Sequence, residues 1–420
     1  MNKKIRFLFM SVLLYIPVVA SSRAGERPVM PTDHSDSVTI HKVSAEVFPC
    51  YVFNTAPFFA GENAAGKPID ATLSTHLKYS FKLGKNTDLG RIYPNTFQGI
   101  GLAWNTFFNK KEVGIPTALY LFQNARIATL APNLYLNYEW NFGITYGWNK
   151  YDEEHNPKNT VVGSKANAYI NLGILLDWEF APMWNLTAGI GLTHFSNGNT
   201  RYPNAGVNSI GGRIGVSRSF EGPGRKEKKD ELIGSDPDFK GHHETNFRRH
   251  MTYDLIVYGA SRKKAINIET EPFIVPGDFG IIGVNFSPMY NVSRYFRAGV
   301  SADFQYDECA NIEAHIPEGT IIGDGMKFYR PPFIERGSFG LSARVELVMP
   351  FFSINIGLGR NIICRGKDTD GWYNTFALKA DIWHDCFIHI GYQLYNFKNP
   401  NNLMLGIGYR FNNGRNKARR

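Results

Sequence analysis

Two stretches of the chain alternate between apolar and polar positions. From residue 133 to 148, and again from 166 to 180, large apolar side chains occupy every second position and polar or very small residues lie between them. A β-strand places successive side chains on opposite faces, so this period of two predicts strands with one apolar and one polar face. The two apolar rows are Leu134, Leu136, Tyr138, Trp140, Phe142, Ile144, Tyr146 and Trp148, and Ile170, Leu172, Ile174, Leu176 and Trp178.

The predicted strands and their connections are typical of a membrane barrel. The strands are about ten to fifteen residues long, against five or six in most globular sheets. Their apolar faces tend to begin or end in an aromatic residue, as interfacial girdles do. Short turns on one side, such as Ala181-Pro182 and His384-Asp385, alternate with long polar loops on the other, about 149–165, 197–206 and 305–336. This asymmetry indicates a transmembrane antiparallel outer-membrane β-barrel, although alternation alone also fits a soluble β-sandwich.

The strand count leaves the number of barrels open. Fifteen segments qualify as strands, and a closed bacterial barrel needs an even number, so we expect an all-β protein of 14 to 16 strands. From residue 166 onward, short turns fall consistently on one side of the barrel and long loops on the other. The error in the strand count is therefore expected before residue 133. We expect one wide barrel made of residues 72–220 and 249–411, joined by a charged connector at 221–248. The alternative is two smaller eight-stranded barrels in tandem.

The two ends of the chain are expected to lie outside the barrel. Residues 1–24 combine a basic start, a short apolar stretch and small residues, which predicts a secretory signal peptide removed on export. Residues 25–71 are expected to form an irregular periplasmic N-terminal extension, and residues 412–420 form a basic tail. No later segment has the roughly 18 uninterrupted apolar residues of a membrane helix.

The composition of the chain indicates which kinds of molecule this protein binds. Aromatic residues make up 14% of the chain and charged residues only 20%, which fits short strands better than a soluble enzyme. The formal net charge of +9 indicates basic loops that suit anionic lipid head groups, and no nucleic-acid partner is expected. The four cysteines do not make a disulfide scaffold. Cys309 and Cys364 lie in loops on one side and are a candidate pair in an oxidising compartment.

One strand carries candidate catalytic groups. Beginning at Trp184, its apolar outward row continues into His194 and Ser196, whose side chains share a face about 7 Å apart. Asn208 has the same outward parity on the returning strand. A histidine beside a serine can remove the hydroxyl proton during attack on an ester, and a third polar group can orient the imidazole. Amides at the turn Asn197, Gly198 and Asn199 would stabilise the oxyanion. The alternative is that these are ordinary interfacial residues.

A resemblance sharpens this hypothesis. The segment His194-Phe195-Ser196-Asn197-Gly198, followed by Pro203-Asn204-Ala205-Gly206-Val207-Asn208, resembles the HxSN and PNxG signature of PagL-type lipid A 3-O-deacylases, or acyloxyacyl hydrolases. The resemblance is clear over about 183–220 and extends from residue 72. It implies an outer-membrane barrel that hydrolyses a 3-O-linked acyl chain of lipid A in lipopolysaccharide, without a cofactor. Ser196 would be the nucleophile, His194 the general base and Asn197 part of the oxyanion hole.

The position of Asn208 departs from the family pattern. The well-known family members carry glutamate there. An asparagine oxygen can orient imidazole but cannot stabilise imidazolium by charge, so we expect a slower enzyme. A carboxylate from Asp152, Glu153 or Glu154 is an alternative partner, because their loop is predicted on the same side. A degenerate site without activity is a further alternative.

Other candidate sites and functions are less well supported by their patterns. A metal site at His242, His243 and Glu244 lies in a charged connector, where solvated side chains are the plainer interpretation. The carboxylates of Asp307, Glu308, Glu313, Glu318 and Asp324 do not have EF-hand spacing, so no metal is expected. The competing function is a non-catalytic pore or structural barrel, because a barrel of 14 or more strands with polar inward faces can hold a channel.

Overall fold

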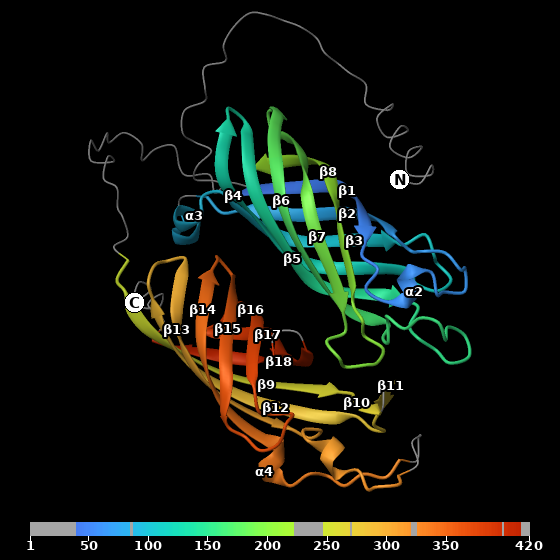
Figure 1. Ribbon diagram of the computed structural model, residues 1–420. Coiled ribbons are helices and arrows are strands. Elements are labelled where there is room, and N and C mark those ends of the chain that lie inside the picture. The colour runs from blue at the N-terminus through green and yellow to red at the C-terminus, as the bar shows by residue number, and fades with distance from the viewer. Residues whose placement is uncertain are drawn as a thin grey trace, which may run out of the picture. The chain divides into compact units, whose positions relative to one another are not determined.

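The protein consists of two closed antiparallel β-barrels of eight strands each (Figure 1). The computed structural model describes residues 39–84, 87–221, 247–268, 271–320, 326–396 and 399–412. The expected signal peptide, nearly all of the connector and the basic tail, and the candidate metal ligands His242, His243, Glu244 and Asp324 lie outside these residues. Within them, no helix is long and apolar enough to cross a membrane.

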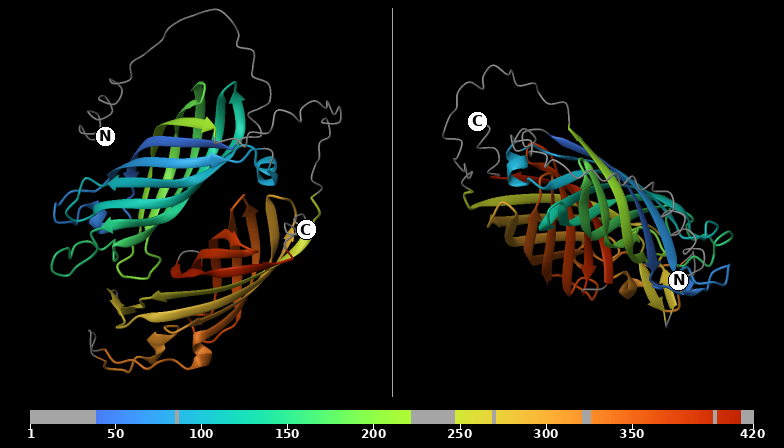
Figure 2. Two further views of the ribbon diagram at one scale, coloured as in Figure 1. Left: turned by 180° about the vertical axis from the view of Figure 1, so that it is seen from behind. Right: turned by 90° about the horizontal axis from the view of Figure 1, so that it is seen from above.

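In both barrels the strands are antiparallel, and the last strand pairs with the first (Figure 2). The first barrel contains β1 (Ile40–Val52), β2 (Ala71–Lys82), β3 (Thr96–Thr106), β4 (Gly114–Ala131), β5 (Leu134–Trp148), β6 (Ala166–Ala181), β7 (Trp184–Ser196) and β8 (Val207–Glu221), with α2 (Pro57–Ala60) and α3 (Asp88–Ile92) in its connections. The second contains β9 (His250–Arg262), β12 (Phe279–Asn291), β13 (Phe296–Asp307), β14 (Gly337–Val348), β15 (Phe352–Ile363), β16 (Trp372–Trp383), β17 (Cys386–Tyr395) and β18 (Asn399–Phe411). A hairpin of β10 (Ala265–Ile268) and β11 (Glu271–Ile274) and two short helices, η1 (Ile312–His315) and α4 (Phe333–Arg336), belong to the connections of the second barrel.

The expected single wide barrel is wrong, and the alternative of two eight-stranded barrels is confirmed. The strand missing from the sequence count is β1, which lies before residue 133 and inside the segment expected to be an irregular extension. It pairs with β2 on one side and β8 on the other. Its alternation is hard to recognise because apolar Phe48 and Val52 share the buried inward face with Glu46, and Pro49 interrupts the run.

The predicted faces of the strands are confirmed with one exception. Along β6 and β7 the apolar rows are exposed on the outside of the barrel, and the intervening polar residues are buried inside it. Trp148 was expected on the outer face of β5 but is buried. Gly147 before it has a φ of +106°, and the pairing of β4 with β5 shifts register nearby. This irregularity turns the last side chain of β5 to the inside.

The interiors of both barrels are packed with side chains of the strands themselves. In the first, the Arg213 guanidinium lies 2.5 Å from the Glu139 carboxylate, and the Lys78 ammonium lies 2.8 Å from it. In the second, the Lys379 ammonium contacts Glu346 at 2.6 Å and Asp254 at 2.8 Å. An eight-stranded barrel is only wide enough for such side chains. The channel needed by the pore alternative is absent from the parts of both barrels that the structure describes.

The remaining sequence candidates also have defined places. All four cysteines are free, so the candidate pair of Cys309 and Cys364 does not form. The Cys309 sulfur instead accepts a hydrogen bond from Arg262 Nε at 3.2 Å. Of the calcium candidates, Asp307 forms an ion pair with Arg262 at 2.5 Å, and Glu308 accepts a hydrogen bond from the Gly280 amide. Among the described residues, no group of three or more His, Cys, Asp or Glu residues is placed to hold a metal ion.

Candidate active site

The outer end of β7 brings a histidine and a serine into contact. His194 and Ser196 occupy alternate positions of the strand and project from the outward face, where both are half-buried. The His194 Nε2 and Ser196 Oγ atoms are 3.0 Å apart. The i, i+2 spacing predicted this shared face, and side-chain rotation brings the two groups within hydrogen-bond distance. The serine hydroxyl can therefore donate to an unprotonated imidazole nitrogen.

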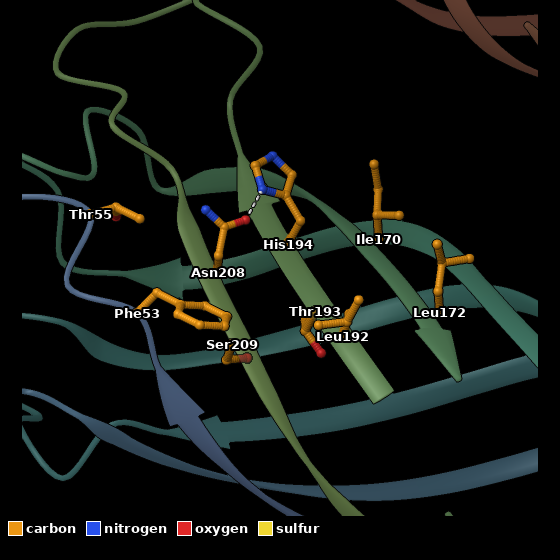
Figure 3. Close-up of a pocket in the computed structure, with 9 residues that line it drawn as sticks. All are labelled: Phe53, Thr55, Ile170, Leu172, Leu192, Thr193, His194, Asn208 and Ser209. Atoms are coloured by element: carbon orange, nitrogen blue, oxygen red, sulfur yellow. Dashed lines mark hydrogen bonds between the residues drawn. The ribbon is translucent and has the colours of Figure 1, made fainter. Parts of the chain in front are cut away.

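Asn208 completes the arrangement from β8. Its backbone is the register partner of His194, and its Oδ1 lies 2.7 Å from His194 Nδ1 (Figure 3). An amide oxygen only accepts hydrogen bonds, so Nδ1 carries the proton and donates it to Asn208. The opposite nitrogen, Nε2, is then left as the acceptor that faces Ser196. The three side chains that the sequence analysis singled out therefore form one continuous relay.

Aromatic packing inside the barrel fixes the end of the strand that carries the relay. Phe195, between the histidine and the serine, points inward and is buried. Its ring lies 5.2 Å from that of Trp148 and 5.5 Å from that of Tyr169, centroid to centroid. Aromatic pairs at such distances contribute about 0.5–1.5 kcal/mol beyond simple burial. The buried Trp148 thus helps to anchor β7 at the end where its outward side chains form the candidate site.

The turn after Ser196 is held by side-chain amides. The Asn197 backbone N–H donates to Asn204 Oδ1 at 3.0 Å, and Asn204 Nδ2 donates to Asn199 Oδ1 at 3.1 Å. The Asn197 side chain donates to the Arg201 carbonyl at 2.8 Å. Gly198 and Asn199 both have a φ of 63°. Sequence reasoning named the three oxyanion candidates but missed Asn204, whose position in the PNxG motif was the available signal.

Gly206 leaves room for the imidazole. Its φ of 72° is left-handed, and a Cβ added there would lie 3.2 Å from His194 Cε1. Its carbonyl accepts a hydrogen bond from Thr55 Oγ1 at 3.2 Å. The glycine of the motif therefore serves both the turn and the histidine, a role that sequence reasoning did not assign.

A groove of about 520 Å³ runs along the outer wall beside the histidine. Four apolar residues line it, Phe53, Ile170, Leu172 and Leu192, together with the polar residues His194, Asn208, Thr55, Thr193 and Ser209 (Figure 3). Phe53 follows β1, and its backbone N–H donates to the Asn208 carbonyl at 2.9 Å. Sequence reasoning missed this wall of the groove because it placed the whole segment 25–71 outside the barrel.

The acidic loop before β6 does not supply a partner for the histidine. Asp152 accepts hydrogen bonds at 3.0 Å from both the backbone N–H and the ring Nδ1 of His155, and these bonds lower its pKa. Glu153 and Glu154 are exposed. Because Asn208 occupies Nδ1 of His194, the alternative in which one of these three carboxylates takes its place is not found in the structure. The neutral partner is the one that the structure uses.

Comparison with known proteins finds a matching family model for each of the two barrels. Residues 74–217 match the family model for lipid A 3-O-deacylase (PagL), and residues 251–413 match the model for the acyloxyacyl hydrolase C-terminal domain. No curated protein matches the chain. Among solved structures, an outer membrane protein of Acinetobacter baumannii is 8% identical, with a TM-score of 0.16, and covers 89% of this chain and 99% of its own. The siderophore receptor PirA of Pseudomonas aeruginosa is 9% identical, with a TM-score of 0.23, and the match covers 88% of this chain and 80% of PirA. At these TM-scores the likeness carries no argument.

The two matched ranges together cover most of the chain and coincide with the two barrels. The signature residues that carried the resemblance lie at the end of β7 and the start of β8, inside the first range. The chain therefore belongs to the PagL-type lipid A 3-O-deacylase family, the acyloxyacyl hydrolases, which are ester hydrolases built as outer-membrane β-barrels.

Proposed function

We propose that the first barrel deacylates lipid A through a serine nucleophile, Ser196, activated by His194 and oriented by Asn208. Membership of the family supports outer-membrane lipid A deacylation. The finer assignment depends on one observation, the unbroken chain of hydrogen bonds from Asn208 to His194 and on to Ser196. These groups face the lipid side of the barrel, where the acyl chains of the substrate already lie.

The reaction follows from the positions of the protons. Ser196 Oγ attacks the carbonyl carbon of the acyl ester as His194 Nε2 takes the hydroxyl proton. The tetrahedral intermediate collapses, the sugar oxygen leaves with the proton from His194, and the acyl chain stays on the serine. Water, deprotonated by the same nitrogen, then attacks the acyl-enzyme and releases the fatty acid. Asn208 keeps Nδ1 protonated throughout, so Nε2 is always the basic nitrogen.

The turn Asn197, Gly198 and Asn199 is proposed to hold the oxyanion. Two successive left-handed residues after the nucleophile turn neighbouring backbone N–H groups toward one side, an arrangement that forms anion-binding concavities. The Asn197 N–H already donates to Asn204, so the next amide, that of Gly198, is the better candidate. Removing one such donor typically costs a factor of about 10² to 10³ in kcat.

The apolar groove is proposed to receive the acyl chain being cleaved. Ile170 lies beside His194, its register partner, and the next outward pair of the two strands, Leu172 and Leu192, continues the groove (Figure 3). The chain reaches this wall from surrounding lipid that is as apolar as the wall itself, so packing against these side chains, and not removal from water, holds it in place. This wall selects a lipid ester over a small soluble one.

Mass spectra of lipid A from cells that express wild-type protein or Ser196→Ala test the proposal. Wild type is expected to remove one acyl chain, and the variant is expected to leave lipid A intact. The matched control is Ser217→Ala, since Ser217 lies on β8 but is buried in the barrel interior. Identical acylation with wild type and Ser196→Ala, when both are present in the outer membrane, would refute the serine mechanism.

A further inference from the structure

A cationic surface lies on the loops next to the catalytic turn. We define it by Lys150 and Lys165, at the two ends of the loop between β5 and β6, and by Arg201 in the loop between β7 and β8. The hydroxyl-bearing residues Tyr151 and Ser164 directly neighbour the two lysines in the chain, and an isolated bridge between Val162 and Asn204 joins the two loops. Each of the three cations is exposed. No residue of the proposed serine mechanism belongs to this surface.

Backbone pairing brings the two lysines together. The Tyr151 N–H donates to the Val162 carbonyl at 2.7 Å, which closes the long loop on itself. Lys150 directly precedes this closure, and Lys165 follows it by three residues. The closure therefore brings the backbone of the two lysines to the same part of the loop. Like charges held at one point raise the local potential and attract an anion.

A second contact docks this loop on the catalytic hairpin. Val162 forms an isolated antiparallel bridge with Asn204, the residue that holds the turn after Ser196. Gly163 packs so closely that an added Cβ would lie 2.6 Å from backbone atoms of Tyr202 and Pro203. The position of the cationic surface relative to the catalytic turn is thus fixed by contacts that only a small residue at 163 allows.

The distance from the nucleophile suits a head group. Ala168 is the register partner of Ser196, and Lys165 lies three residues beyond it toward the loop. At about 3.3 Å per residue, this places its Cα about 10 Å beyond that pair. The flexible stem of lysine covers much of that span. A phosphate on the sugar whose acyl ester is at Ser196 lies within reach.

We infer that Lys150, Lys165 and Arg201 bind a phosphate of the lipid head group and so select phosphorylated lipid A. The inference rests on the proposed function, because the ester must be held at Ser196. Lysine binds phosphate as a point charge, whereas the guanidinium of arginine presents a planar fork.

Steady-state release of fatty acid by the full-length protein in detergent micelles tests the inference. The substrates are bisphosphorylated lipid A and the same lipid A after enzymatic dephosphorylation. For Lys150→Gln/Lys165→Gln, we expect KM for the bisphosphorylated lipid to rise about tenfold, equivalent to about 1.4 kcal/mol, with kcat unchanged. KM for the dephosphorylated lipid should not change. Lys110→Gln/Lys111→Gln, which removes two charges from the loop between β3 and β4, should behave as wild type.

Each other outcome has a definite meaning. Equal KM values of wild type for the two lipids, or an equal rise for both in the lysine variant, overturn the phosphate assignment. Inorganic phosphate should raise KM no more than sodium chloride of the same ionic strength. If phosphate inhibits wild type more strongly than that, the lysine variant is not inhibited in this way, and wild type has the same KM for both lipids, the surface is a site for free phosphate and not for the lipid head group. Ser196→Ala separates the two proposals, because it should abolish hydrolysis of both lipids whatever their head group.

Discussion

Replacing Asn208 with aspartate should make this enzyme faster. The proposed mechanism places a positive charge on the His194 ring in the transition state, and its Nδ1 donor faces a neutral amide oxygen at 2.7 Å. Aspartate has the size and shape of asparagine, so Asn208→Asp preserves this contact and adds a negative charge. The charge favours the imidazolium of the transition state over the neutral ring of the ground state, which is the condition for raising kcat.

The size of the effect follows from the position of the pair. Two unit charges about 4 Å apart interact by about 1 kcal/mol in water and about 4 kcal/mol at the effective dielectric constant near a protein surface. Both side chains are half-buried, so we take about 2 kcal/mol. With a factor of ten for each 1.36 kcal/mol, kcat should rise about 30-fold.

Fatty-acid release from lipid A under saturating substrate measures this rise. The control is Asn208→Leu, which removes the acceptor and leaves Nδ1–H unpaired. An unsatisfied donor costs about 1–3 kcal/mol, so kcat should fall by about five- to 160-fold. A rate for Asn208→Asp at or below that of wild type would refute the reasoning, as would full activity of Asn208→Leu.

Two further variants test the site and the barrel. Gly206→Ala should lower kcat about tenfold, because the new Cβ would lie 3.2 Å from His194 Cε1 and displace the ring from its position beside Ser196. Gly212→Ala, whose new Cβ would have only an ordinary contact with the Gly189 carbonyl oxygen at 4.0 Å and which has no positive φ, is its control, and equal rates for the two would contradict this role of Gly206. Arg213→Met should lower the free energy of unfolding in urea by about 3–5 kcal/mol, since it leaves buried Glu139 without one of its two cations. Arg218→Met on the exposed face of β8 is the comparison, and a loss of similar size there would argue against the buried network as the cause.

The sequence determined the strands and the outward row that carries the site. Side-chain period is a local property of the backbone, so the alternation in β6 and β7 was enough to place His194 and Ser196 on the apolar face. The outward position of Asn208 followed in the same way from the alternation along β8. The same rule failed where a local irregularity reversed it, as Gly147 did for Trp148.

The tertiary structure alone decided how the strands close and which groups meet. Barrel closure depends on pairing between strands far apart in the chain, such as β1 with β8, and no local pattern records that choice. The mixed inner face of β1 concealed a strand whose following residue, Phe53, borders the groove. The partner of His194 was likewise open among an amide and three carboxylates, because hydrogen-bond distances depend on register and side-chain rotation. Only the folded hairpin assigns that place to Asn208.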